Sequence, residues 1–358
     1  MAGAANLEIV VAHPGGGELV KAYIAGEAVA EPFFGGHFGR LESYVTKARE
    51  VDARFDRAAR ERAAAAMLVP PGGDPARLAR WVEEGGYLVT TGQQPGLFGG
   101  PLYNVSKALT AVRLAAALEE RLGRPVLPLF WVSSEDHDWD EACHADIVGV
   151  DNELHRIEIA APEAGIAPPI HRIRLRNGSA EAVEEFVGYL PTTDFSSEYV
   201  GLLREAFAPG RTIAEGFHVT LQQLLGRFGV FFTDGALPAV KRASLPLLMD
   251  ELDRAAEFEG VLAATATSLE EAGYALQVPI LEGSVNLFLE GPAGRERLYR
   301  SAGGYRLRTS GEQLSRDEIA RRVQEDPSVL SPNVLLRPVV ESAIFPTLSY
   351  VGGPGEMA

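Results

Sequence analysis

Apolar positions along the chain follow two spacings, which together predict alternating strands and helices. Near-continuous apolar runs predict buried parallel strands at YLVTT (87–91), PVLPLFWVSS (125–134), GVFFTDG (229–235) and TLSYV (347–351). Helical spacing predicts helices over 41–67, 75–84, 102–122, 179–190, 196–208, 212–227 and 237–273. Strand, helix and strand in succession indicate an α/β fold with a parallel sheet covered on both faces.

Polar and glycine residues mark several predicted helix ends. Asp74 is a candidate N-cap followed by Pro75, and Gly123 is expected to end the helix over 102–122. Ser315 with Glu318 three residues later predicts a capping box at a surface helix.

Two regions alternate apolar and polar residues and interrupt this pattern. HRIEIAAPEAGIAPPIHRIRL (155–175) predicts two short strands around a loop, and the residues from about 280 to 310 predict a second β-rich insertion.

Composition narrows the function to a small-molecule enzyme or binding protein. The 358 residues carry a formal net charge of -16, which gives no bulk attraction for nucleic acid. A single cysteine excludes a disulfide framework and a Cys-rich zinc site. We expect no secretory signal and no membrane span, because no basic leader and no run of about 18 apolar residues occurs. A cytoplasmic protein is therefore expected.

Polar or Gly-rich residues follow each of the four predicted strands. In an open α/β sheet, ligands bind beyond the carboxyl ends of the strands. The candidates after the four runs are Gly92-Gln93-Gln94-Pro95-Gly96, Ser133-Ser134-Glu135-Asp136-His137-Asp138, Asp234-Gly235 and Gly352-Gly353-Pro354-Gly355-Glu356.

The first of these segments could bind an anion. Gly96, Gly99 and Gly100 permit close backbone approach, and the following helix offers free N–H groups and, one turn in, Lys107. A plain strand-to-helix turn, in which the glycines serve only packing, explains the same residues. The loop has no Gly-Lys-Ser/Thr, and the chain has no G-x-S-x-G or H-E-x-x-H motif.

The second segment, SSEDHDWDEACH, surrounds His137 with carboxylates. Glu135, Asp136 and Asp138, with Asp140 and Glu141 nearby, would suit His137 to general acid–base chemistry. A rival use is a divalent metal bound by His137, Asp136, Asp138 and His144, although the spacing matches no zinc pattern. An acidic loop that caps the next helix is the third alternative.

Three further residues have both a chemical and a structural interpretation. Cys143 could be a nucleophile or a buried apolar side chain. Arg337 could bind a carboxylate or pair with an acidic side chain, and Asn333 could contact a ligand or form a turn.

Four blocks in order resemble the BshC family, the cysteine ligases of bacillithiol biosynthesis. They are TGQQPGLFGGPLYNVSKALTAVRLA, LPLFWVSSEDHDWDEACH, LSPNVLLRPVVE and PTLSYVGGPGEMA. The resemblance implies a Rossmann-like, doubly wound parallel sheet similar to class I nucleotidyltransferases, with two connecting-peptide insertions. The divisions expected are 1–150 for the first half of the core, 151–211 and 280–330 for the insertions, and 212–279 and 331–358 for the rest of the core.

The resemblance also implies an activity. The family reaction joins the carboxyl of L-cysteine to the amine of glucosaminyl-malate, with ATP or ADP as a possible nucleotide ligand and no covalent cofactor. Family members continue into a helix and a coiled coil that makes a homodimer, so we expect this chain to be a fragment or a shortened product. Synthetase-type enzymes have a His-x-Gly-His-like element at the start of the helix that follows the first strand. At that position this sequence has Gly100-Pro101-Leu102-Tyr103-Asn104.

We therefore predict a site at the strand ends. His137 would be the base, supported by Glu135 and Asp138. The predicted substrate-binding residues are Gly92, Gln93, Gln94, Gly96, Gly100, Tyr103, Asn104, Lys107, Ser134, Asp136, Asn333, Arg337, Gly353, Gly355 and Glu356, with no metal. Alternatives are a nucleotidyltransferase-like enzyme with another acceptor and a non-catalytic module that binds cysteine or nucleotide.

Overall fold

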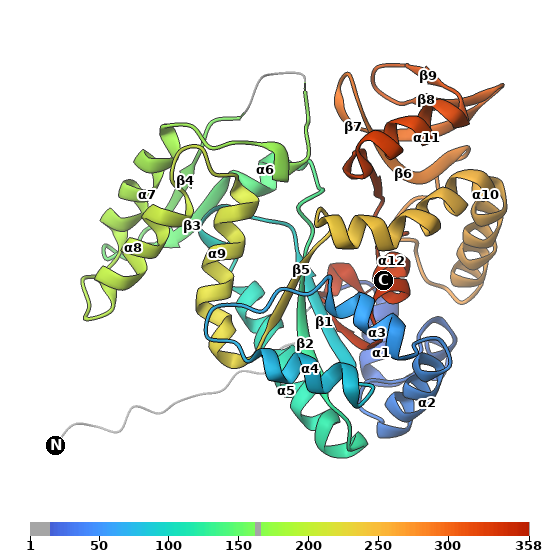
Figure 1. Ribbon diagram of the computed structural model, residues 1–358, viewed down its shortest axis with the longest axis horizontal. Coiled ribbons are helices and arrows are strands. Elements are labelled where there is room, and N and C mark those ends of the chain that lie inside the picture. The colour runs from blue at the N-terminus through green and yellow to red at the C-terminus, as the bar shows by residue number, and fades with distance from the viewer. Residues whose placement is uncertain (1–14, 162–165, 358) are drawn as a thin grey trace.

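A parallel four-stranded sheet forms the centre of the molecule (Figure 1). This computed structural model describes residues 15–161 and 166–357, so the amino-terminal residues 1–14, where no secretory signal is expected, lie outside it. The strand order is β11-β1-β2-β5, with all neighbours parallel. The strands are β1 (Tyr87–Gln93), β2 (Val126–Val132), β5 (Phe231–Asp234) and β11 (Thr347–Val351). The predicted α/β, Rossmann-like fold is confirmed.

Helices cover both faces of the sheet because successive strand residues point to opposite sides. On one face, Val89 and Phe130 pack in clusters with residues of α2, α5 and α9. On the other face, Leu88 and Trp131 pack in a cluster with residues of α3, α4, α10 and α12. These helices are α2 (Leu41–Asp52), α3 (Arg57–Ala64), α4 (Pro75–Glu83), α5 (Tyr103–Leu122), α9 (Ile213–Leu225), α10 (Pro238–Glu271) and α12 (Arg337–Ile344).

The predicted helix ends are confirmed where a cap was identified. The Asp74 side chain accepts a hydrogen bond from Ala76 N, and Gly123 adopts the left-handed conformation (φ 64°) that ends α5. Ser315 and Glu318 form the predicted capping box.

The single helix predicted over 41–67 is wrong. The chain breaks between α2 and α3, where Phe55 is buried in the core and the Asp56 side chain caps α3 by accepting a hydrogen bond from Ala59 N (2.7 Å). Burial of one aromatic side chain and a new cap outweigh the helix propensity of the segment.

The described part of the first insertion contains an antiparallel pair with the helices α6 (Trp139–Ala142), α7 (Gly178–Tyr189) and α8 (Ser196–Ala206). The second strand predicted within 155–175 is wrong. β4 (Leu154–Glu158) pairs instead with β3 (His144–Val148), and the later segment forms η3 (Ile170–Arg172). The expected division at residue 151 thus falls between the two strands of one pair.

The second insertion is a five-stranded antiparallel sheet in the order β10-β6-β7-β8-β9. Its elements are β6 (Ser284–Gly291), β7 (Gly294–Ser301), β8 (Gly304–Leu307), β9 (Gln313–Leu314), β10 (Leu330–Pro332) and α11 (Arg316–Glu325). The remaining short elements are α1 (Glu18–Ala25), η1 (Glu31–Phe33), η2 (Leu97–Gly99), η4 (Gly226–Phe228), η5 (Pro327–Val329) and η6 (Pro354–Glu356).

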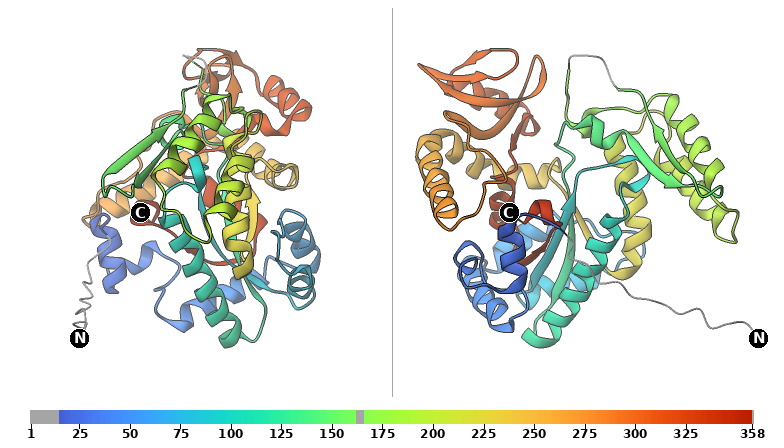
Figure 2. Two further views of the ribbon diagram at one scale, coloured as in Figure 1. Left: turned by 90° about the vertical axis from the view of Figure 1, so that its left-hand side faces the viewer. Right: turned by 180° about the vertical axis from the view of Figure 1, so that it is seen from behind.

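The two insertions form separate lobes on opposite sides of one end of the central sheet, as the front and back views agree (Figure 1; Figure 2). Within the described ranges, none of the helices combines the length and the apolar character needed to cross a bilayer.

Candidate functional site

A cleft of about 360 Å³ opens where β1, β2 and β11 end and where β6, β7 and α12 approach them. The chain leaves β1 toward β2 and β5 on one side and later adds β11 on the other. Such a reversal of strand order creates a crevice in α/β proteins. The predicted residues that line the cleft are Gly92, Gln93, Gln94, Glu135, Asp136, His137, Asn333, Arg337, Gly355 and Glu356.

Gly92 at the end of β1 has a steric role. A Cβ there would lie 2.6 Å from the carbonyl oxygen of Trp131 on the neighbouring strand, so only glycine fits. The Gly92 carbonyl accepts a hydrogen bond from Lys107 Nζ on α5 (2.6 Å).

Lys107, behind the cleft, links the end of β1 to the turn after β11. Its Nζ lies 2.6 Å from Glu356 Oε2 and 3.3 Å from Gln93 Oε1. Glu356 also accepts a hydrogen bond from Gly353 N (2.6 Å), which fixes the turn after β11. Burial lowers the pKa of Lys107, although the Glu356 carboxylate opposes that shift. The predicted anion-binding lysine is thus already paired with a carboxylate.

His137 contacts an arginine that the sequence analysis missed. Arg295 Nη1 lies 3.1 Å from His137 Nδ1. A guanidinium can only donate, so Nδ1 accepts, and a neutral ring then carries its proton on Nε2. Asp136 lies 3.5 Å from the same nitrogen. Burial alone would raise the pKa of Asp136, but its contacts with His137 and the charge of Arg295 hold it below its usual range.

The two carboxylates expected to support His137 have other partners. Glu135 forms a buried ion pair with Lys241 of α10, and Lys241 Nζ also donates to the Leu330 carbonyl (2.7 Å). The Asp138 side chain accepts from Glu141 N at the start of α6, as the capping alternative predicted. The structure therefore brings Asp136 and Arg295, rather than Glu135 and Asp138, to His137.

Arg295 and Arg297 form a positively charged wall on β7. Their guanidinium carbons lie 3.9 Å and 5.0 Å from the centre of the Phe288 ring on β6. Arg295 is held by Ser331 Oγ and the Pro332 carbonyl, both at 2.9 Å. Within the described chain, the Arg297 guanidinium has no carboxylate partner, and its one hydrogen bond is to Ser284 Oγ (3.5 Å). Burial lowers the pKa of both guanidinium groups.

The remaining wall carries Asn333 and Arg337. Asn333 Oδ1 accepts hydrogen bonds from Leu335 N and Leu336 N (3.0 Å each), which hold the turn that leads into α12, while its amide donates to Asn286 Oδ1 (2.9 Å). Arg337 Nη1 lies 2.8 Å from Glu341 Oε2. Both residues line the cleft while they hold its wall in place.

Several predicted binding residues do not line the cleft. They are Gly96, Gly100, Tyr103, Asn104, Lys107, Ser134 and Gly353. Asn104 is buried and donates to the Gly99 carbonyl (3.2 Å), which shapes the glycine loop. Ser134 is fully buried and donates to Asp234 Oδ1 (2.5 Å), whose other oxygen lies 3.0 Å from His218 Nε2. Tyr103 is half exposed beside Lys107. These side chains support the cleft from behind or flank it.

Two of the alternatives for the acidic segment, a metal site and a nucleophilic Cys143, receive no support from its geometry. Across residues 15–161 and 166–357, no group of three or more His, Cys, Asp or Glu side chains gathers as metal ligands do. Cys143 is buried, and burial raises the pKa of its thiol to about 11, which keeps it protonated at neutral pH.

The missed cleft residues include Arg295, Arg297, Phe288 and Tyr350. Alternation in RERLYR places both arginines on one face of a strand. Nothing in the local pattern showed that this strand lies against the core, so the signal was insufficient without the fold.

Fold and cleft together define a Rossmann-like domain with a candidate small-molecule site at the carboxyl end of its sheet. The chain belongs to the family described as "Bacillithiol biosynthesis BshC, N-terminal Rossmann-like domain", which matches residues 7–358. The resemblance identified from the sequence is thereby confirmed.

Three relatives carry the name "Putative cysteine ligase BshC". The one from Solibacter usitatus is 33% identical over 318 residues, which cover 89% of this chain and 58% of the relative. Those from Koribacter versatilis and Symbiobacterium thermophilum are each 35% identical and cover 77% and 75% of this chain. The chain spans about half the length of these relatives, namely 58%, 51% and 50%.

Proposed function

We propose that the chain is part of a cysteine ligase that joins the carboxyl of L-cysteine to the amine of glucosaminyl-malate, which gives bacillithiol. The observation that carries this proposal is the pair of guanidinium groups, Arg295 and Arg297, at the cleft of a chain with net charge -16. Malate supplies two carboxylates for two guanidinium groups. The family and the names of the relatives support the cysteine half of the reaction.

The two substrates would occupy opposite walls of the cleft. The malate carboxylates would lie against Arg297 and Arg295. They would supply the negatively charged partner that Arg297 lacks. Cysteine would lie on the other side, against Gln93, Gln94 and the end of β1. This arrangement brings the sugar amine toward His137.

Amide formation requires a neutral amine, because an alkyl amine is mostly protonated at neutral pH. In a neutral His137 ring the nitrogen that can take up a proton is Nδ1, and in this structure Nδ1 accepts a hydrogen bond from Arg295. A substrate carboxylate that binds Arg295 Nη1 would release Nδ1 to accept the amine proton. The amine nitrogen then forms the C–N bond with the carboxyl carbon of cysteine. The leaving group on that carboxyl departs with the electrons of its C–O bond. ATP is the proposed source of that leaving group.

Binding is tested with calorimetry on the chain itself. Glucosaminyl-malate should bind at least about tenfold more tightly than glucosamine, because glucosamine lacks both carboxylates. Arg297→Met should remove this preference, whereas Arg174→Met, in the first insertion, should leave it unchanged. Equal affinity for the two ligands, or an unaltered preference in the Arg297 variant, would exclude the proposed placement.

Turnover is tested by mass spectrometry of the full-length protein mixed with L-cysteine, ATP and glucosaminyl-malate. We expect the mass of bacillithiol, its absence when ATP is omitted, and a rate lowered by about 10²–10⁴ in His137→Gln. A normal rate in that variant would exclude His137 as the base. Tight binding without any product would instead favour the non-catalytic module. The homodimer and the cytoplasmic location stay predictions.

A further inference from the structure

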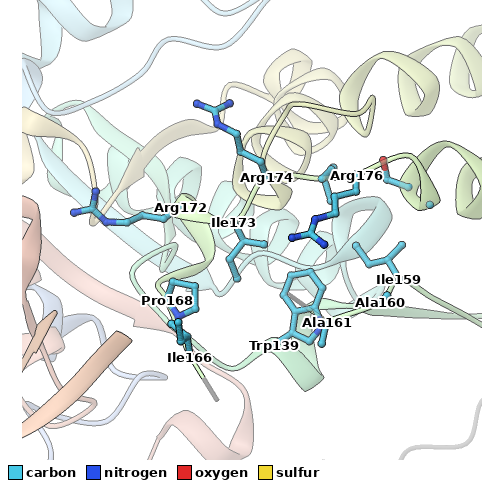
Figure 3. Close-up of a pocket in the computed structure, with 13 residues that line it drawn as sticks. Trp139, Ile159, Ala160, Ala161, Ile166, Pro168, Arg172, Ile173, Arg174 and Arg176 are labelled. Carbon is cyan, nitrogen blue, oxygen red and sulfur yellow. The ribbon is translucent and has the colours of Figure 1, made fainter. Parts of the chain in front are cut away.

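A second cavity lies in the first insertion and is separate from the cleft. Its volume is about 430 Å³, and none of the described residues that line it also lines the cleft. Trp139 at the start of α6, the residues after β4 and the segment around η3 form its walls (Figure 3). This volume is in the range that accommodates a small molecule.

The cavity combines an apolar surface with positive charge. Trp139, Ile159, Ile173 and Leu175 contribute to the apolar wall. No aspartate or glutamate is among its described lining residues, although acidic residues outnumber basic ones 49 to 33 in the sequence. The lining therefore departs from the charge of the whole chain in the direction that favours an anion.

One arginine is oriented into this cavity. Figure 3 shows the Arg176 guanidinium directed toward Trp139, whereas those of Arg172 and Arg174 are directed away from it. Arg172 is paired with Glu290 and Asp326, and Arg174 Nη1 donates to the Gly210 carbonyl (2.7 Å). Among the described residues, the Arg176 guanidinium has neither a salt bridge nor a hydrogen bond, so its donors are available to a ligand.

The wall of this cavity also supports the cleft. Pro168 and Arg172 line the cavity. In the same segment, Ile170 N donates to the Asp136 carbonyl (2.7 Å) and His171 N to the Ser134 carbonyl (3.0 Å). The Ala167 carbonyl accepts a hydrogen bond from Arg295 N (3.0 Å). The segment thus contacts both the His137 loop and the arginine strand of the cleft.

We propose that this cavity is a second ligand site, which binds a small organic anion with a flat apolar body. The apolar part lies against Trp139 and Ile173, and a carboxylate or phosphate pairs with Arg176. The site is independent of the chemistry in the cleft. The site shares no described lining residue with the substrate cleft.

The test uses benzoate and phenyl phosphate as probes of the two anion types, with benzyl alcohol as the uncharged analogue. Each is titrated into the 358-residue chain while tryptophan fluorescence is recorded. Trp81 and Trp131 are buried elsewhere in the core, so a Trp139→Phe variant shows which part of the signal arises in the cavity.

We expect saturable binding of at least one anion and weaker binding of benzyl alcohol. Arg176→Met should weaken anion binding by about tenfold or more, since a charge-assisted hydrogen bond is lost. Arg174→Met and the cleft variant Arg297→Met should change it by less than about twofold. All three arginines are at least partly exposed, and far-ultraviolet circular dichroism confirms that each variant is folded.

Three results would overturn the proposal. They are no saturable signal from Trp139 with either anion, equal affinity for benzyl alcohol, and unchanged affinity in the Arg176 variant. A loss of binding in the Arg297 variant would place the anion in the cleft instead. If only one anion binds, the ligand class is narrowed to carboxylates or to phosphates.

Discussion

The buried pair between Glu135 and Lys241 allows a quantitative test of whether Glu135 is structural. The side chains are 10% and 4% exposed, and Lys241 Nζ keeps one other acceptor, the Leu330 carbonyl. Loss of one partner from a buried pair costs about 3–5 kcal/mol, because an uncompensated charge stays in the core. With about 1 kcal/mol retained from the remaining hydrogen bond, we expect Glu135→Leu to cost about 2–4 kcal/mol.

The double variant Glu135→Leu/Lys241→Met should be far less unstable than the two single variants together. Hydrocarbon side chains of similar volume often replace a buried ion pair at little cost. The Leu330 carbonyl then loses a donor, which costs about 1–3 kcal/mol. The coupling energy between the two positions should therefore reach about 2 kcal/mol or more.

Equilibrium unfolding in urea, followed by tryptophan fluorescence, measures all four proteins of this cycle. Single variants that each lose less than about 1 kcal/mol, or a double variant whose loss equals the sum of the single ones, would refute the reasoning. In either case Glu135 would not be engaged by Lys241 as the structure shows, and its carboxylate would again be a candidate partner for His137.

Three further predictions follow, two from contacts at the cleft and one from the partner of Arg172 beside the second cavity. Gly92→Ala should destabilise the fold by about 1–3 kcal/mol, because the new methyl group meets the Trp131 carbonyl, and a thermal midpoint that does not fall would contradict this. Asn333→Ala removes the side-chain acceptor of the turn before α12 and the amide that donates to Asn286, so it should cost about 1–2 kcal/mol in urea unfolding, and an unchanged unfolding midpoint would contradict this. Hydrogen bonds from Ser328 and Arg172, which outweigh burial, lower the pKa of Asp326 from 3.8 to about 2. The contribution of Asp326 to stability is therefore full above pH 3.8 and is lost as the pH falls toward 2. The difference in unfolding free energy between the unaltered chain and Asp326→Asn should vanish over that interval.

Sequence patterns predicted the core of the fold because local physics determines it. The four apolar runs became the four parallel strands, and the caps at Asp74, Gly123 and Ser315 were identified from residues that have few alternative uses. The errors occurred where a tertiary contact decided between local alternatives. Phe55 broke the helix predicted over 41–67 by entering the core, and β4 paired with the preceding strand rather than the following segment.

The candidate site was predicted only in part, for a similar reason. Strand ends identified the Gly92 loop, the Asp136–His137 segment and the turn at Glu356, since parallel strands end at a common edge. The contribution of Arg295 and Arg297 depends on how a separate sheet lies against the core. Likewise, the partners of Glu135 and Ser134 are far away in sequence, 106 and 100 residues respectively, where no local pattern reaches.

The contact between Lys107 and Glu356 also has a consequence for biosynthesis. A ribosome that has translated Lys107 must add another 249 residues before Glu356 exists, which takes roughly 12–50 s at about 5–20 residues per second. During that interval the nascent chain lacks both β11 and the carboxylate that neutralises the lysine. The edge of β1 that will receive β11 is unpaired during that time and open to chaperones. Ligands cannot therefore assist folding of the nascent chain through a completed cleft until the turn after β11 has left the ribosome.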